Sequence, residues 1–268
     1  MKKLILFTIL LVAVLQTKIQ AQQVFSKQSE VILILNDNSE IRGLIIEEDD
    51  NQIVIQNDQL GLLTFQKTDI KKINRLNNKG WIANPNPTKY FIGQSAFSLK
   101  KGEGYYQNVM ALVNGVQYGI TDRLSAGVGV ELISLTNGNP IFLANAKYAI
   151  PISGKLKFAA SGNFLTLLDE GTIGSLSGLA TYGSEESNFT FGAGYGIAGG
   201  GLTSDVVVTL NGMVRIARRF SLVMENYILP GNNEILNLTG VRLINRRNTM
   251  DLMLVQGQIP LVSFVFQF

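Results

Sequence analysis

The chain ends in a stretch, Ile259–Phe268, that reads IPLVSFVFQF. From residue 262 onward, every second residue has a large apolar side chain, namely Val262, Phe264, Phe266 and Phe268. Because side chains alternate between the two faces of a β-strand, the stretch presents a ladder of aromatic rings to one side. A soluble sheet would cover such a face with a second layer, whereas lipid supplies that layer around a transmembrane barrel. The stretch therefore predicts the closing strand of a transmembrane β-barrel.

The composition favours strands that cross a membrane over helices that do so. Of the 268 residues, 46% are hydrophobic and 16% are charged, against about 25% charged in soluble domains. Beyond Leu15 no uninterrupted apolar run approaches the roughly 20 residues that a membrane helix needs. High apolar content without long runs is typical of strands in which apolar and polar residues alternate.

The first 21 residues have the pattern of a secretory signal peptide. Met1-Lys2-Lys3 is a basic start, Leu4–Leu15 is an apolar core, and Ala21 is a small residue at the cleavage position. About twelve apolar residues are too few for an anchor helix. We therefore expect residues 1–21 to be removed and the mature chain to begin at Gln22.

Charge and residue usage exclude several classes of function. Three of the 23 basic residues lie in the predicted signal peptide, so 20 remain against 20 acidic residues, and no nucleic-acid partner is expected. The chain has neither Cys nor His, which excludes thiolate metal sites and the usual general base of hydrolases. We expect no cofactor, no metal and no catalytic residues, and hence a protein that is not an enzyme.

Residues 22–76 are predicted to form a small β domain in the periplasm. Short apolar runs at 31–35, 41–46, 53–55, 62–65 and 70–73 are separated by polar turns, and five such strands pack most simply as a small barrel or roll. The run from Val31 to Gly43, with its Asn36-Asp37-Asn38-Ser39 turn, resembles the start of SH3-like or Sm-like small barrels, and Thr68–Ile73 is similar to their closing strand. The resemblance implies a small five-stranded barrel, and we expect this periplasmic module either to contact a partner or to plug the base of the membrane barrel.

Residues 77–89 read as a linker, because Asn, Pro and Gly interrupt every pattern there. Residues 90–268 then form an antiparallel up-and-down transmembrane barrel of about twelve strands, with ten as the alternative. The strands are expected at 90–99, 105–120, 124–135, 140–150, 155–168, 172–183, 187–200, 205–216, 219–229, 235–245, 248–256 and 260–268. Turns such as 121–123 are assigned to the periplasmic side, and connections such as 100–104 to the outer side.

In six of these strands, every mid-strand charge lies on the parity opposite the bulky apolar residues. Because Arg or Lys facing mid-bilayer lipid costs roughly 2–4 kcal/mol, the charged parity should face the lumen. The predicted lumen charges are Glu131, Lys147, Lys157, Arg215, Glu225, Arg242 and Asp251. If Arg246-Arg247 is a two-residue turn, Arg242 and Asp251 lie opposite each other and form an ion pair. These charges either pair within a filled lumen or form a selectivity ring for a small solute.

Residues 90–268 resemble the outer-membrane β-barrel proteins of Gram-negative bacteria, on the basis of the signal peptide, the alternating strands, the turn Tyr118–Arg123 and the terminal Phe268. The resemblance implies outer-membrane lipid and the barrel-assembly machinery as partners. It also implies that Phe264, Phe266 and Phe268 act as the assembly signal. Two functions remain open: a non-enzymatic, porin-like narrow channel for small solutes, or a structural anchor that holds a periplasmic protein partner through the N-terminal domain.

Overall fold

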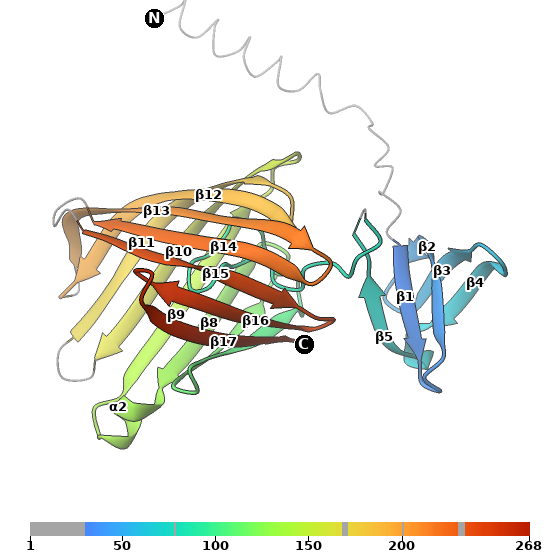
Figure 1. Cartoon of the computed structure of the whole chain (residues 1–268), viewed down its shortest axis with the longest axis horizontal. Helices are drawn as coiled ribbons and strands as arrows, with labels where there is room; N and C mark the ends of the chain where they lie inside the picture. The colour runs from blue at the N-terminus through green and yellow to red at the C-terminus, as the bar shows by residue number, and fades with distance from the viewer. Residues whose placement is uncertain (1–29, 78, 168–170, 200, 230–233) are drawn as a thin grey trace, which may run out of the picture. The chain divides into compact units, whose positions relative to one another are not determined.

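The computed structural model of the chain (Figure 1) describes residues 30–268 apart from 78, 168–170, 200 and 230–233. The chain divides into two compact units, Met1–Gly80 and Trp81–Phe268. The predicted signal peptide and the predicted mature start at Gln22 lie outside the described residues. Within the described ranges, no helix is both long and apolar enough to cross a membrane.

The first unit is a five-stranded antiparallel sheet in the order β4-β3-β2-β1-β5. Its elements are β1 (Glu30–Leu35), β2 (Glu40–Glu48), β3 (Gln52–Asn57), β4 (Gly61–Gln66), the short 3-10 helix η1 (Lys67–Asp69) and β5 (Ile70–Arg75). The alternating apolar residues that predicted these strands form one core, in which Val31, Leu33, Ile53 and Ile55 are fully buried.

The sheet of the first unit is not closed into the small barrel that the turn pattern predicted. β4 and β5 are its two edges, and among the described residues no pairing joins them. The register of β2 against β3 shifts between Ile45 and Glu47, and such a bulge bends a strand and increases its twist. The unit is therefore an open sheet with one bent strand, and the SH3-like or Sm-like assignment stays a prediction.

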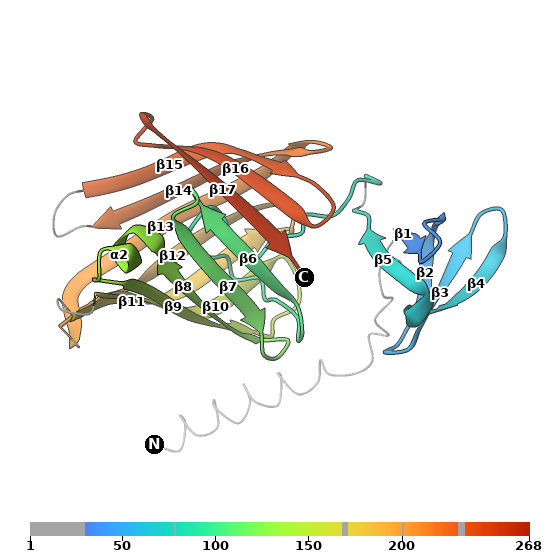
Figure 2. The same cartoon turned by 90° about the horizontal axis from the view of Figure 1, so that it is seen from below.

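The second unit is a closed antiparallel barrel of twelve strands (Figures 1 and 2), so the predicted count is confirmed and the alternative of ten is wrong. Its elements are β6 (Gly104–Val109), β7 (Val113–Gly119), β8 (Leu124–Glu131), the short helix α2 (Leu132–Thr136), β9 (Ile141–Ile150), β10 (Leu156–Leu167), β11 (Gly171–Gly183), β12 (Ser187–Ala198), β13 (Gly201–Ala217), β14 (Phe220–Leu229), β15 (Glu234–Ile244), β16 (Asn248–Val255) and β17 (Ile259–Gln267). Each strand pairs with the next, and β17 closes the ring by pairing with β6.

The first barrel strand differs from the prediction. Residues 90–99 form no strand of the ring, and β17 pairs with Tyr105–Val109 instead. The single strand predicted at 105–120 is two strands, β6 and β7, joined by a tight turn in which Met110 and Ala111 have positive φ (54° and 61°). The two errors cancel, which is why the predicted count was right.

The connection 100–104 was predicted at the barrel end opposite the C-terminus, and this was wrong. The backbone N–H of Gly104 donates to the carbonyl of Phe268 (3.0 Å), so the connection lies at the barrel end that carries the last residue of the chain.

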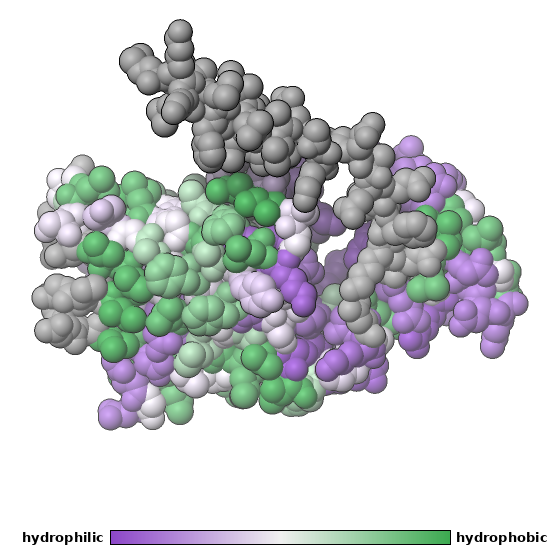
Figure 3. Space-filling view, turned by 90° about the horizontal axis from the view of Figure 1, so that it is seen from above, coloured by the Kyte–Doolittle hydropathy of each residue, from purple (hydrophilic) through white to green (hydrophobic). Residues whose placement is uncertain are grey.

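The outer surface of the barrel is apolar, as the parity argument predicted. On β12 the outward Phe189 and Phe191 alternate with the buried Asn188 and Thr190. Figure 3 shows hydrophobic residues, in green, over much of the visible face of the barrel. Phe264, Phe266 and Phe268 are 53%, 45% and 52% exposed and belong to this surface. An apolar outer surface around a buried polar interior is the arrangement that a lipid environment stabilises.

Candidate functional site in the barrel lumen

Residues 84–99, here called the lumen segment, lie inside the barrel; they belong to the teal trace within the ring of strands in Figures 1 and 2. Pro85 and Pro87 lack an N–H and disfavour regular structure around them, so this backbone joins no sheet. Backbone polar groups that are buried need hydrogen-bond partners. The barrel wall supplies them, through the contacts described below.

Glu225 on β14 binds three consecutive backbone N–H groups of the lumen segment. Its carboxylate accepts from the N–H of Phe91, from Ile92 (2.9 Å) and from Gly93 (3.1 Å), and the Tyr227 hydroxyl donates to it as well (3.0 Å). The side chain of Glu225 is 0% exposed. Hydrogen bonds to a charged group contribute about 1.5–3 kcal/mol each, and this set offsets part of the cost of burying a charge.

Arg242 on β15 binds backbone carbonyls of the same segment. Its guanidinium pairs with Asp251 on β16 (2.7 and 3.0 Å) and donates to the carbonyls of Asn86 (3.0 Å), Lys89 (3.2 Å) and Tyr90 (2.5 Å). Arg242 and Asp251 are opposite residues in the β15–β16 register, and both are 0% exposed. The predicted ion pair is therefore confirmed, and the planar guanidinium uses its remaining donors on the lumen segment.

Lys147 on β9 completes this set of charges from the other side of the ring. Its ammonium donates to the carbonyls of Thr88 (3.0 Å), Ser95 (2.9 Å) and Phe97 (2.7 Å). An ammonium has three donors, and each of them has a carbonyl partner here. The lumen segment is thus bound through its backbone by one anion and two cations of the wall.

Neutral side chains bind the segment between these charges. The Tyr90 hydroxyl lies 2.6 Å from Asn188 Oδ1 and from the Thr190 hydroxyl on β12. The backbone N–H of Ala96 donates to the Thr181 hydroxyl (2.8 Å), which in turn contacts Thr190 (2.6 Å). These contacts orient the segment without adding charge.

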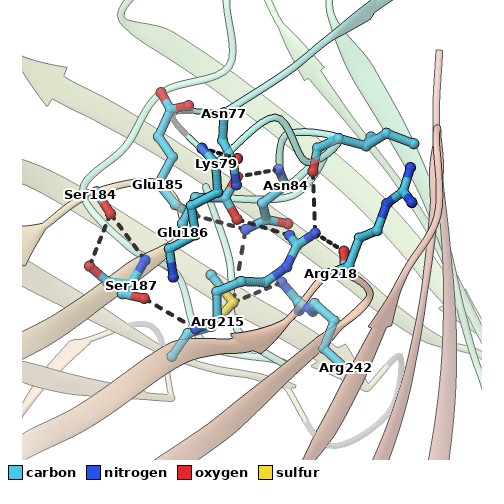
Figure 4. Close-up of polar contacts among 12 residues, drawn as sticks. Asn77, Lys79, Asn84, Ser184, Glu185, Glu186, Ser187, Arg215, Arg218 and Arg242 are labelled. Atoms are coloured by element: carbon cyan, nitrogen blue, oxygen red, sulfur yellow. Dashed lines mark hydrogen bonds and ion pairs between the residues drawn. The ribbon is translucent and has the colours of Figure 1, made fainter.

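Arg215 on β13 forms a further group of contacts at the start of the lumen segment (Figure 4). It pairs with Glu186 (2.8 Å), whose other oxygen accepts the backbone N–H of Asn84 (2.8 Å). The same guanidinium donates to the carbonyl of Arg218 (2.5 Å) and lies 5.9 Å from the centre of the Trp81 ring. Glu186 thereby joins the turn between β11 and β12 both to the segment and to β13.

The seven charges predicted for the lumen do not form one ring. Lys147, Arg215, Glu225, Arg242 and Asp251 are buried on the inward side of the wall. Glu131 instead caps α2, where its carboxylate accepts from Ile133 and Ser134, and Lys157 donates to the Ile152 carbonyl in a turn.

Sequence reasoning did not find the lumen segment itself. Its only signal is the Asn84-Pro85-Asn86-Pro87 run, a polar, strand-breaking stretch directly before aromatic residues.

A cavity of about 590 Å³ remains between the lumen segment and the wall. Ile92, Gly93 and Gln94 of the segment line one side of it, and its wall extends to Val109 and Val113, which flank the turn between β6 and β7. Because β6 starts beside Phe268 and ends at Val109, the cavity lies toward the barrel end opposite Phe268. The segment therefore fills one part of the lumen and leaves the other hollow.

By its architecture the protein belongs to the class of closed β-barrels. It has twelve strands, an apolar exterior and a backbone segment inserted into the lumen. No protein-family model matches the chain, and no curated protein matches it. Among solved structures it is similar to the KdgM porin (TM-score 0.47, 7% identity, covering 62% of this chain and 98% of that chain). It is also similar to the NanC porin in a rhombohedral crystal form (0.40, 11%, 62% and 97%) and to the KdgM porin in complex with disordered oligogalacturonate (0.44, 6%, 62% and 96%). These values carry no inference about ligands.

Proposed function

We propose that this protein is a non-enzymatic outer-membrane β-barrel that forms a narrow channel for small solutes, with the lumen segment as its closure. The apolar outer surface supports the membrane location. In this proposal the barrel end that carries Phe268 faces the periplasm, together with the N-terminal unit. The barrel-assembly machinery reads Phe264, Phe266 and Phe268.

The observation that supports a closed channel is the binding of the lumen segment by Glu225, Arg242 and Lys147. These charges contact backbone atoms rather than open water, so they do not act as a selectivity ring in this state. Opening requires the segment to leave its three charged partners. Each partner then regains water, so the energetic cost of opening is smaller than the sum of the broken hydrogen bonds.

Planar-bilayer recordings test this proposal. The wild-type barrel should be silent or open rarely, and deletion of residues 84–99 should produce clear single-channel steps. Lys157→Gln is the matched control, because Lys157 contacts a turn carbonyl and not the segment, and it should behave as wild type. A folded deletion variant that remains silent would refute the channel.

The second candidate is a structural anchor. A segment bound inside the lumen ties the first unit of the chain to the membrane by a covalent link that does not depend on conduction. Affinity purification of the full chain from membranes separates the candidates. A silent barrel, with or without the segment, that co-purifies with a periplasmic protein supports the anchor, and that partner should be lost when residues 22–76 are removed.

A further inference from the structure

The inward-facing side chains change character along the lumen. Near the lumen segment they are polar, as in Lys147 and Asn145 on β9. Two residues further along the same face is Leu143, which is paired across the ladder with Leu165, and Leu165 is paired in turn with Ile173. The inward apolar residues that line the cavity at this level are Val109, Val113, Leu143, Leu165, Ile173 and Val207.

A water-filled channel does not need apolar side chains on the inward-facing positions of its strands. Concave sites with mostly apolar walls and a few convergent polar groups are instead typical of small-molecule binding, at volumes of about 300–1,000 Å³. The cavity, at about 590 Å³, falls in that range. Its polar groups come from the lumen segment and the adjoining wall, and include Gln94, Asn145 and Tyr227.

Lys89 on the lumen segment lines this cavity with an ammonium that makes no direct ion pair with any described residue. The residue is 2% exposed, its ammonium donates to Gln107, and it lies 5.3 Å from the centre of the Tyr105 ring. In the part of the chain that the structure describes, no carboxylate forms an ion pair with Lys89. The carboxylates of Asp251 and Glu225 attract Lys89 through space, but their direct contacts are made elsewhere, since Asp251 pairs with Arg242 and Glu225 binds backbone N–H groups.

A buried ammonium with one hydrogen bond is costly, and an anion beside it would compensate for that cost. The ligand that fits must therefore bring an anionic group to the polar side of the cavity and an apolar body to its apolar walls. A fully polar anion would leave the apolar walls uncovered, and a neutral apolar molecule would leave Lys89 without a direct ion pair.

We propose that the cavity is a binding site for an amphipathic monocarboxylate, whose carboxylate contacts Lys89 and whose hydrocarbon chain lies along Leu143, Leu165 and Ile173. The site goes beyond the proposed channel. It rests on that proposal only for the membrane placement of the barrel, because binding does not require conduction.

Native mass spectrometry of the full chain, released from a neutral detergent, tests the site with dodecanoate as the probe and dodecanol as its uncharged match. Lys89→Gln removes the cation, Ile173→Trp narrows the apolar part while leaving Lys89 intact, and Lys157→Gln is the lysine control outside the cavity. Heat-modifiable migration on gels establishes that each variant is a folded barrel.

We expect one dodecanoate per wild-type chain and the same affinity in the Lys157→Gln variant. Lys89→Gln should weaken dodecanoate roughly tenfold or more, since a charged hydrogen bond is lost. Ile173→Trp should weaken it too, and dodecanol should bind wild type roughly tenfold more weakly than the acid.

The proposal is overturned if the folded wild type shows no saturable binding, or if acid and alcohol bind equally. It is also overturned if either cavity variant binds dodecanoate as tightly as wild type. If the Lys89→Gln variant does not fold, the affinities of the wild-type protein for dodecanoate and dodecanol still test the proposal. Native mass spectrometry measures ligand binding, whereas planar-bilayer current measures conduction. Failure of the binding-site proposal can therefore be distinguished from failure of the channel proposal.

Discussion

Replacing Glu225 by Gln should release the lumen segment locally while the barrel stays folded. The carboxylate is 0% exposed, with Phe91 and Ile92 on Oε1 and Gly93 and the Tyr227 hydroxyl on Oε2. The Gln oxygen can keep the two bonds at Oε1, but its NH₂ group then faces the Gly93 N–H, which is also a donor.

The size of the effect follows from these contacts. A buried donor left without a partner costs about 1–3 kcal/mol, and each bond that changes from a charged to a neutral acceptor loses about 1 kcal/mol. Removing the buried charge recovers part of its desolvation cost. We therefore expect Glu225→Gln to lower the free energy of local opening of the lumen segment by about 3 kcal/mol, which corresponds to a roughly hundredfold change in the opening equilibrium.

Amide hydrogen exchange at residues 91–93 measures this opening directly, because exchange of a protected amide reports its local opening free energy. Ser221→Ala is the matched control, since Ser221 lies on the same strand, faces inward, and its buried hydroxyl has no hydrogen-bond partner. It should leave exchange unchanged. If Glu225→Gln speeds exchange at residues 91–93 by less than threefold, then Glu225 does not hold the segment and the reasoning fails.

Three other predictions concern the ion pair, the first unit and the chain terminus. Arg242→Met leaves Asp251 buried without its partner, so urea unfolding in lipid vesicles should show a loss of about 3–5 kcal/mol. Adding Asp251→Leu should recover part of that loss, and unchanged stability of the single variant would contradict the pairing. In the first unit, burial raises the pKa of the Glu48 carboxyl, but its hydrogen bonds and ion pairs with Arg75 (2.7 Å) and Lys67 (3.2 Å) together outweigh burial, so the pKa is lowered. The stabilisation is then present above the ordinary carboxyl pKa and is lost as the pH falls through the lowered value. Glu48→Gln should remove this acid-sensitive part from the exchange of first-unit amides, and an identical pH profile in the variant would count against it. Deleting Phe268 should lower the fraction of barrel inserted into the outer membrane more than it changes any channel activity; normal insertion would argue against an assembly role.

The features that could be predicted from the sequence are those that a local rule imposes. Lipid outside and a polar interior force alternation on every strand, so the outward side of Phe189 and Phe191 could be read from the residues alone. A two-residue turn sets the register of its hairpin, so Arg246-Arg247 was enough to place Arg242 opposite Asp251.

The lumen segment could not be predicted, because its partners are distant in the chain. Tyr90 and Phe91 look like the start of a strand, and nothing nearby shows that their backbone is bound by Glu225 and Arg242, more than 130 residues later. The turn at Met110–Leu112 was missed for a related reason. It adopts positive φ without Gly or Asn, so the usual turn signal is lacking.

The closing seam of the ring has a property that follows from the position of Gln107. β17 and β6 pair over five residues, the shortest ladder in the described part of the ring. Gln107 lies in that seam and donates both to Ser263 across it (2.9 Å) and to the carbonyl of Phe91 in the lumen segment (3.0 Å). The inserted segment thus reinforces the ring from within at its shortest ladder. The presence of the lumen segment and the closure of the barrel wall are therefore mechanically coupled. When the segment is removed, the strands should separate first between β6 and β17.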